Sequence, residues 1–238
     1  MESATLVCLP FAGSGASFFK KWQAVAPPGL RVVAPQLPGR EERLDDEPHI
    51  TVEAAVSEAS GWLLPRIADT SRVALFGHSL GAVLAYELAY RLSGQVPVVG
   101  LFVSGSAGPW SVRQDRASGL DDEGFLVAVR RLAGYRHPAM DHPEMLEMLL
   151  PMLRADVEMH ENHRPQARPP LGIPVTAVRG DRDDLVTAAE CGQWGDATTG
   201  PFDSVELAGG HMYLTEPTGE RALLRLIENR LDARAAAC

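Results

Sequence analysis

The sequence is poor in several features that mark particular classes of protein. Its three cysteines, at positions 8, 191 and 238, are too few and too scattered for a disulfide framework. No run approaches the roughly 18 apolar residues of a membrane span, and the N-terminal residues lack the charged and apolar segments of a signal peptide. We therefore expect a protein of the reducing cytoplasm that has no membrane partner.

Basic residues are also scarce. The 22 Lys and Arg residues are outnumbered by 31 Asp and Glu residues, and the only lysines are Lys20 and Lys21. The formal net charge of −9 argues against nucleic acid as a general partner. The length of 238 residues and the hydrophobic fraction of 45% suit one large α/β domain, or one domain with an insertion.

Strand and helix patterns alternate along most of the chain. The early strand patterns are continuous apolar runs, which is typical of parallel strands covered by helices on both faces. The pattern therefore predicts a doubly wound α/β fold. The expected strands lie at 5–11, 31–34, 73–76, 98–103, 173–178 and 202–207.

This alternation stops between residues 110 and 170, where no strand pattern occurs. Two helices are expected there instead, at 121–135 and 143–160. We expect an α/β core at 1–109 and 171–238 and a helical lid inserted at 110–170. Two interpretations are open for the methionines of this region. They pack in an ordinary core, or they form a pliable face of a lid that accepts flexible apolar chains. These residues are Met140, Met145, Met148, Met152 and Met159.

The strongest single motif is Gly-x-Ser-x-Gly at Gly77, Ser79 and Gly81. An apolar strand pattern precedes it and a helix pattern follows, as in a nucleophile elbow. There the serine occupies a sharp turn, and glycines are needed where strand and helix approach closely. The alternative is a glycine-rich turn with a bystander serine. We expect Ser79 to be a nucleophile.

His211 is the candidate for the general base. A serine hydroxyl is a poor nucleophile until a base accepts its proton, and histidine is the usual base. His211 follows a strand pattern and a Gly-Gly pair, which allows a tight loop. His160 and His163 have the spacing of a metal-ligand pair, but the sequence offers no evident third ligand, so we expect no metal. The other histidines occupy polar or proline-flanked stretches or the elbow itself: His49, His78, His137 and His142.

A carboxylate is needed to hold the histidine in its working orientation. When the three residues follow the chain order serine, acid, histidine, this carboxylate is expected in the turn after the strand at 173–178. Three aspartates share this turn, and the Gly180-x-x-Asp183 spacing favours Asp183. Asp181 and Asp184 remain alternatives.

An oxyanion hole requires two backbone N–H groups. One is expected from Leu80, directly after the nucleophile. The second is expected from the loop after the first strand, at Phe11 or Ala12, because Pro10 has no N–H group.

These motifs together resemble the type II thioesterases of polyketide synthases and non-ribosomal peptide synthetases. The resemblance rests on the elbow and on three further segments, at 9–14, 38–40 and 209–214, and spans nearly the whole chain. It implies an α/β-hydrolase fold with a mobile helical lid, and a triad of Ser79, Asp183 and His211. It also implies removal of stalled or aberrant acyl groups from the phosphopantetheine arm of an acyl or peptidyl carrier protein. The substrate carries the phosphopantetheine, so no cofactor is expected, and we expect a monomer.

Three rival functions remain. The chain could be a carboxylesterase that acts on free esters, although it lacks the His-Gly-Gly-Gly motif of many such enzymes. It could be a stand-alone thioesterase that releases a finished product. It could also be a hydrolase-fold binding module with a vestigial triad.

Overall fold

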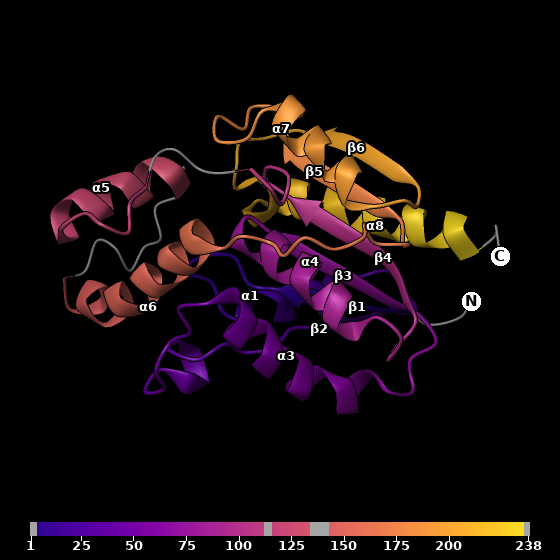
Figure 1. The fold of residues 1–238 in the computed structure, drawn as a ribbon, viewed down its shortest axis with the longest axis horizontal. Coiled ribbons are helices and arrows are strands. Elements are labelled where there is room, and N and C mark those ends of the chain that lie inside the picture. Colours follow the sequence, from indigo (N-terminus) through magenta and orange to yellow (C-terminus); the bar gives the residue numbers. More distant parts are fainter. Residues whose placement is uncertain (1–3, 112–115, 134–142, 236–238) are drawn as a thin grey trace.

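The computed structural model describes residues 4–111, 116–133 and 143–235. Six strands form one sheet in the order β2-β1-β3-β4-β5-β6, and every neighbouring pair is parallel. Helices cover the sheet on both faces (Figure 1). The predicted doubly wound α/β fold is therefore confirmed.

The strands are β1 (Ala4–Leu9), β2 (Leu30–Val33), β3 (Val73–His78), β4 (Val98–Ser104), β5 (Val175–Gly180) and β6 (Phe202–Leu207). The helices are α1 (Ser17–Lys20), α2 (Trp22–Val25), α3 (Val52–Ile67), α4 (Leu80–Leu92), α5 (Asp122–Ala133), α6 (Pro143–Asn162), α7 (Ala188–Gly192) and α8 (Pro217–Ala235). Short 3₁₀ helices are η1 (Glu41–Arg43), η3 (Gln193–Ala197) and η4 (Tyr213–Thr215). None of the described helices has the length and hydropathy that a membrane crossing requires.

The sheet separates two hydrophobic cores, because successive side chains of a strand point to opposite faces. In β1, Val7 and Leu9 pack with α3 and α4, whereas Leu6 and Cys8 pack with α1, α2 and α8. All four side chains are buried, which explains why this strand reads as a continuous apolar run.

Helices α5 and α6 lie between β4 and β5 in the sequence and form the left-hand end of the molecule in Figure 1. They share a small hydrophobic cluster of their own, in which Phe125 and Val129 of α5 meet Leu153 of α6. This cluster is separate from the two cores of the sheet.

The methionines of this region do not share one environment. Met152 and Met159 are buried, and Met159 belongs to the core that contains α4. Met145 and Met148 are 47% and 57% exposed. Core packing therefore accounts for two of the methionines in α6. Met140, like His137 and His142, lies outside the described residues.

Candidate active site

Ser79 lies in the turn between β3 and α4 with a strained backbone. Its φ of 53° and ψ of −117° fall in a region that non-glycine residues rarely adopt. Its N–H group donates to the carbonyl oxygen of Ser104 at 2.8 Å, which ties the turn to the end of β4. The side chain is neither fully buried nor fully exposed.

The two motif glycines are required by close backbone approach. A Cβ atom at Gly77 would lie 1.8 Å from the carbonyl oxygen of Gly81. A Cβ atom at Gly81 would lie 2.4 Å from the carbonyl oxygen of Leu9. The start of α4 therefore packs directly against the end of β1, and this brings the loop after β1 next to Ser79.

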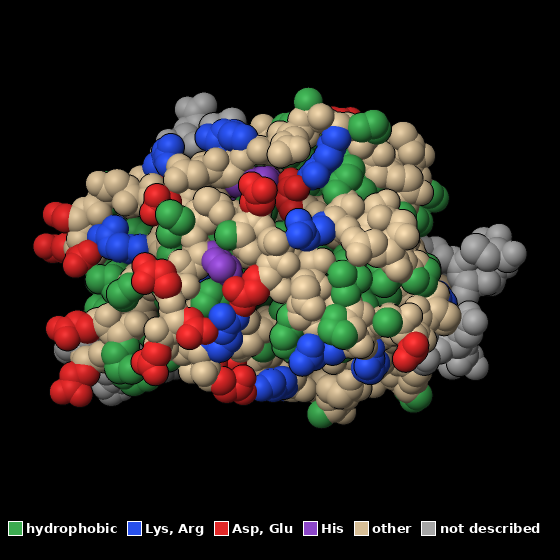
Figure 2. Space-filling model, turned by 60° about the horizontal axis from the view of Figure 1, so that its bottom comes forward, with side chains coloured by type: hydrophobic (Ala, Val, Ile, Leu, Met, Phe, Trp, Pro, Cys, Tyr) green, Lys and Arg blue, Asp and Glu red, His purple; other side chains and the backbone are tan. Residues whose placement is uncertain are grey.

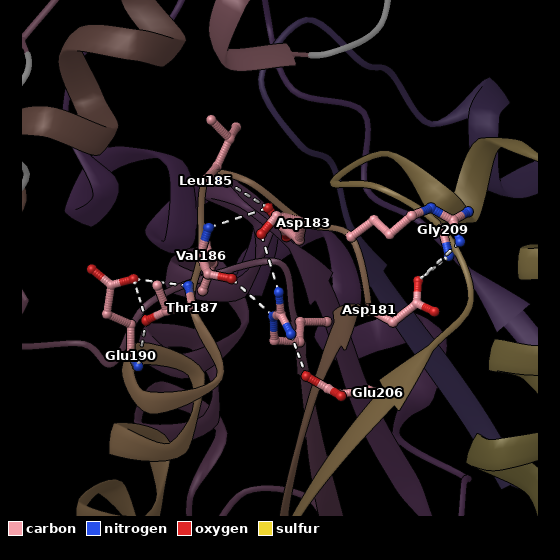
Figure 3. Close-up of polar contacts among 10 residues, drawn as sticks. Asp181, Asp183, Leu185, Val186, Thr187, Glu190, Glu206 and Gly209 are labelled. Carbon is pink, nitrogen blue, oxygen red and sulfur yellow. Dashed lines mark hydrogen bonds and ion pairs between the residues drawn. The ribbon is translucent and has the colours of Figure 1, made fainter.

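Asp183 lies in the loop between β5 and α7, which Figure 3 shows in close-up. Its Oδ1 atom accepts backbone N–H groups from Leu185 at 2.9 Å and Val186 at 3.1 Å. These bonds hold the carboxylate within its own turn. The side chain of Asp183 is fully buried.

The other two aspartates of this turn are exposed. Asp181 accepts the N–H group of Gly209 at 2.9 Å, which links the turn to the loop that precedes His211 (Figure 3). Asp184 makes no side-chain contact with His211 within the described residues. Of the three candidates, only Asp183 is brought into contact with this histidine.

Arg179 also stabilises this turn, although no sequence motif marks it. It is 8% exposed, and its guanidinium group donates to the carbonyl oxygens of Val186 at 2.8 Å and Asp183 at 3.1 Å. The group also pairs with Glu206 on the neighbouring strand β6. An arginine inside an otherwise apolar strand pattern was the signal available for it.

His211 follows β6, and its Nδ1 atom lies 2.9 Å from Oδ2 of Asp183. Burial by itself would raise the pKa of the Asp183 carboxyl. The hydrogen bonds from His211, Leu185 and Val186, together with the charge of His211, outweigh burial and lower this pKa below its ordinary value. Asp183 is therefore a carboxylate at neutral pH, directed at the imidazole.

Ser79 and His211 are not joined by a hydrogen bond within the described residues. They are nevertheless neighbours, because the ring of His211 lies 4.8 Å from that of His78, the residue before Ser79. Hydrogen bonds of this kind are often long or misaligned in the unliganded state and tighten when substrate binds.

Two backbone N–H groups near Ser79 were expected as oxyanion donors, one from Leu80 and the other from Phe11 or Ala12. Leu80 is the first residue of α4, so no carbonyl of its own helix can accept its N–H group. The N–H groups of Phe11 and Ala12 donate to no other group of the described chain, whereas Pro10 has none. All three donors remain available on the two segments that meet at Gly81.

The described residues contain no group of three potential metal ligands. His163 instead lies 3.2 Å from Glu87. These two residues help to line a cavity of about 450 Å³ between α3, α4 and the end of α6, and its lining includes none of Ser79, Asp183 and His211.

The site thus combines a hydroxyl on a strained turn, an imidazole backed by a carboxylate, and unpaired backbone donors. This set of groups suits nucleophilic acyl transfer.

Comparison with known proteins agrees with this chemistry. The family model described as "Thioesterase domain" matches residues 4–231. Thioesterase PikA5 of Streptomyces venezuelae is 38% identical over 220 residues, which cover 90% of this chain and 77% of that protein.

Two solved structures are similar in both fold and sequence. The RedJ thioesterase from the prodiginine biosynthetic pathway of Streptomyces coelicolor superposes with a TM-score of 0.86 at 33% identity, covering 95% of this chain and 92% of that one. The type II thioesterase BorB from the borrelidin biosynthetic cluster superposes with a TM-score of 0.83 at 34% identity, covering 97% and 92%. The predicted resemblance is confirmed, and the chain belongs to the thioesterase domain family.

Proposed function

We propose that this thioesterase hydrolyses acyl thioesters on the phosphopantetheine arm of acyl or peptidyl carrier proteins and so removes stalled or aberrant acyl groups. The observation that carries the proposal is the Asp183–His211 contact of 2.9 Å beside the strained turn of Ser79. In this assignment Ser79 is the nucleophile, His211 the base and Asp183 the residue that orients the base.

The first half of the reaction acylates the serine. His211 takes the proton of the Ser79 hydroxyl as the oxygen attacks the thioester carbonyl carbon. The carbonyl oxygen becomes an oxyanion that accepts the N–H groups of Leu80 and of Ala12 or Phe11. The C–S bond then breaks, and the pantetheine sulfur leaves with the proton that His211 held.

The second half releases the acyl group. His211 takes a proton from a water molecule, and the resulting hydroxide attacks the acyl-Ser79 ester. A second oxyanion forms on the same donors and collapses. The bond to Ser79 Oγ breaks, the serine recovers its proton from His211, and a free carboxylic acid leaves. The carrier protein retains a free thiol.

Carrier proteins of synthases form the proposed partner class, with this chain acting on them as a monomer in the cytoplasm. The names of the relatives support this class, since two of the similar structures come from biosynthetic pathways or clusters. Carrier proteins are usually acidic, and acidic side chains gather at the end formed by α5 and α6 (Figure 2). Exposed arginines nearer Ser79 are therefore the better docking groups, and Arg182, whose side chain is 72% exposed beside Asp183, is such a residue.

We also propose that residues 110–170 act as a lid over the site. Their separate cluster around Phe125 supports this role, because α5 packs on α6 and not on the two cores of the sheet. Removing the Phe125 side chain should separate α5 from α6. The Phe125→Ala variant should then change the preferred acyl chain length while the sheet remains folded.

The central test is intact-protein mass spectrometry of an acylated carrier protein after incubation with wild type or Ser79→Ala. Acyl groups from acetyl to dodecanoyl should be stripped to free thiol by wild type, with turnover reduced by roughly 10⁶ in the variant. A broad preference for short chains supports editing, and a sharp preference for one long chain supports product release. Cleavage of simple esters without any deacylation of the carrier would favour the carboxylesterase. Failure of a fluorophosphonate to label Ser79 in folded protein would favour the binding module.

A further inference from the structure

A buried ion pair joins α6 to the loop that follows β2. Arg40 and Asp156 meet through two parallel hydrogen bonds, from Nη2 to Oδ1 at 2.8 Å and from Nη1 to Oδ2 at 2.9 Å. Their side chains are 4% and 0% exposed. Removing two charges from water is costly, and the attraction between them compensates only when the remaining hydrogen-bonding capacity is satisfied.

The other hydrogen bonds of Arg40 and Asp156 reach the loop after β1. The N–H group of Gly13 donates to Oδ2 of Asp156 at 2.9 Å, and Nη1 of Arg40 donates to the carbonyl oxygen of Ser14 at 3.0 Å. Ser14 in turn donates its N–H and hydroxyl groups to the carbonyl oxygen of Phe11, at 2.9 and 2.8 Å. The ion pair therefore holds one side of a closed turn that spans Phe11 to Ser14.

The same turn carries the expected second oxyanion donor. The N–H groups of Phe11 and Ala12 are unpaired within the described chain, whereas that of Gly13, next in sequence, is held by Asp156. Leu153 of α6 also packs against Gly13, because a Cβ atom at Gly13 would lie 3.2 Å from Cδ1 of Leu153. The backbone of Gly13 has a φ of +80°, a conformation that glycine adopts readily because it has no Cβ atom.

We infer that Asp156 is a positioning residue that fixes the turn from Phe11 to Ser14 and so directs its unpaired N–H groups toward the oxyanion formed at Ser79. The inference rests on the proposed function, because it assumes that Ser79 attacks a carbonyl group. It means that the helical insertion contributes to transition-state stabilisation through a carboxylate that never contacts substrate. Correct seating of α6 then becomes a condition for rapid acylation.

A purely structural role makes a different prediction. Replacing a buried ion pair with apolar side chains of similar volume is often neutral or stabilising. If the pair served stability alone, such a replacement would restore both the thermal stability and the turnover that a single substitution removes. If Asp156 positions the turn, stability returns and turnover does not, because Gly13 still lacks its acceptor.

The experiment compares three variants. Asp156→Asn keeps the side-chain shape but removes the charge, and the double variant Arg40→Met with Asp156→Leu removes both charges. Glu161→Gln is the matched control, since Glu161 is another buried carboxylate of α6 that accepts backbone N–H groups, from Ala117 at 2.6 Å and Ser118 at 3.2 Å, away from the β1 loop. Each variant is measured for Tm, for kcat and KM on an acyl carrier protein, and for the rate of Ser79 labelling by a fluorophosphonate.

In Asp156→Asn we expect kcat to fall by roughly 10- to 100-fold, since the donor is displaced rather than removed. KM should change little. Labelling should slow by a similar factor, because attack of Ser79 on phosphorus also places negative charge on an oxygen before fluoride leaves. Glu161→Gln should lower Tm while its kcat stays close to wild type.

The double variant should regain most of the wild-type Tm and keep the low kcat. Recovery of kcat together with Tm would overturn the inference, and so would an equal loss of kcat in Glu161→Gln at the same loss of Tm. If the double variant does not fold, the comparison of Asp156→Asn with Glu161→Gln decides alone. Failure of the proposed substrate is distinguishable, since wild type would then label at Ser79 without deacylating the carrier, and the labelling rates would still test Asp156.

Discussion

The imidazole ring of His78 lies 4.8 Å from that of His211, with the ring planes inclined at 51°. His78 is fully buried, and its Nδ1 atom lies 2.9 Å from the hydroxyl of Ser104, which in turn lies 2.8 Å from the hydroxyl of Tyr213. Burial, and then the charge of His211, hold the pKa of His78 well below 6.5. His78 is therefore neutral at neutral pH.

This arrangement predicts that His78 makes the protein sensitive to mild acid. In the unfolded chain His78 binds a proton below its ordinary pKa of 6.5, whereas in the folded chain it does not. The folded state is therefore favoured fully above pH 6.5 and loses stability as the pH falls below it, by up to about 1.4 kcal/mol per pH unit for one proton. Denaturant unfolding between pH 8 and pH 5 measures the effect.

The control for this prediction is His78→Asn, which retains a hydrogen-bonding group near Ser104 but does not titrate. Its free energy of unfolding should fall less steeply from pH 6.5 to pH 5 than that of wild type. The difference between the two curves isolates His78 from the neighbouring groups, His211, Asp183 and Tyr213, which both proteins share. Parallel curves would refute the assignment of a neutral buried His78.

Asp183 and Asp184, in the loop between β5 and α7, should differ in their effect on turnover. Asp183→Asn should reduce kcat by about 10⁴ with little change in KM, because the amide cannot stabilise the imidazolium and favours the wrong tautomer. Asp184→Asn is the matched exposed control and should leave kcat close to wild type. Steady-state kinetics on a carrier-bound substrate tests both variants. A larger loss of kcat in Asp184→Asn than in Asp183→Asn would contradict the assignment of Asp183 as the residue that orients His211.

The elbow glycines should not tolerate alanine. Gly77→Ala would bring a methyl group 1.8 Å from the carbonyl oxygen of Gly81, so we expect a loss of more than about 4 kcal/mol or no folded protein. Gly61, exposed within α3, has no atom within 4 Å of an added Cβ. Gly61→Ala should stabilise the protein by up to about 1 kcal/mol. Chemical denaturation separates these outcomes, and a stable Gly77→Ala protein would contradict the close approach.

Arg182 should affect the carrier protein rather than the chemistry. Reversing its charge in Arg182→Glu should raise KM for an acidic acyl carrier by roughly tenfold, and the effect should shrink as salt is added. Hydrolysis of a small acyl thioester should be unchanged. The control is Arg66→Glu, which reverses the charge of an exposed side chain in the last turn of α3. Equal effects of the two variants would indicate general charge repulsion instead of docking near Asp183.

Local patterns in the sequence predicted most of the elements that carry the site. The apolar runs that alternate with helices correspond to a parallel sheet because the strands β1, β3 and β5 are buried on both faces. The spacing from Gly180 to Asp183 selected the aspartate that contacts His211, since the backbone turn between them determines which carboxylate faces inward. Helix α3 likewise begins at a residue type that favours helix starts, since Thr51 is its N-cap and accepts the N–H group of Ala54.

Local patterns do not predict polar contacts between residues that are far apart in the sequence. Arg40 and Asp156 are 116 positions apart, and an Asp within an amphipathic helix usually faces solvent. The contact between the tilted rings of His78 and His211 depends on how the end of β3 and the loop after β6 converge, which no local spacing encodes. The division of the α6 methionines between buried and exposed positions likewise depends on how the helix is oriented against the core.

The helical insertion leaves the sheet after β4 and returns at β5, and these strands are hydrogen-bonded neighbours. A segment whose two ends lie so close can diverge in length and sequence without disturbing the frame that carries Ser79, Asp183 and His211. If the insertion acts as the proposed lid, its exchange would change substrate preference and leave this frame intact. The pairing of Asp156 with Arg40 sets a limit on that freedom, because a transplanted insertion that lacks the carboxylate would leave a buried arginine without its partner.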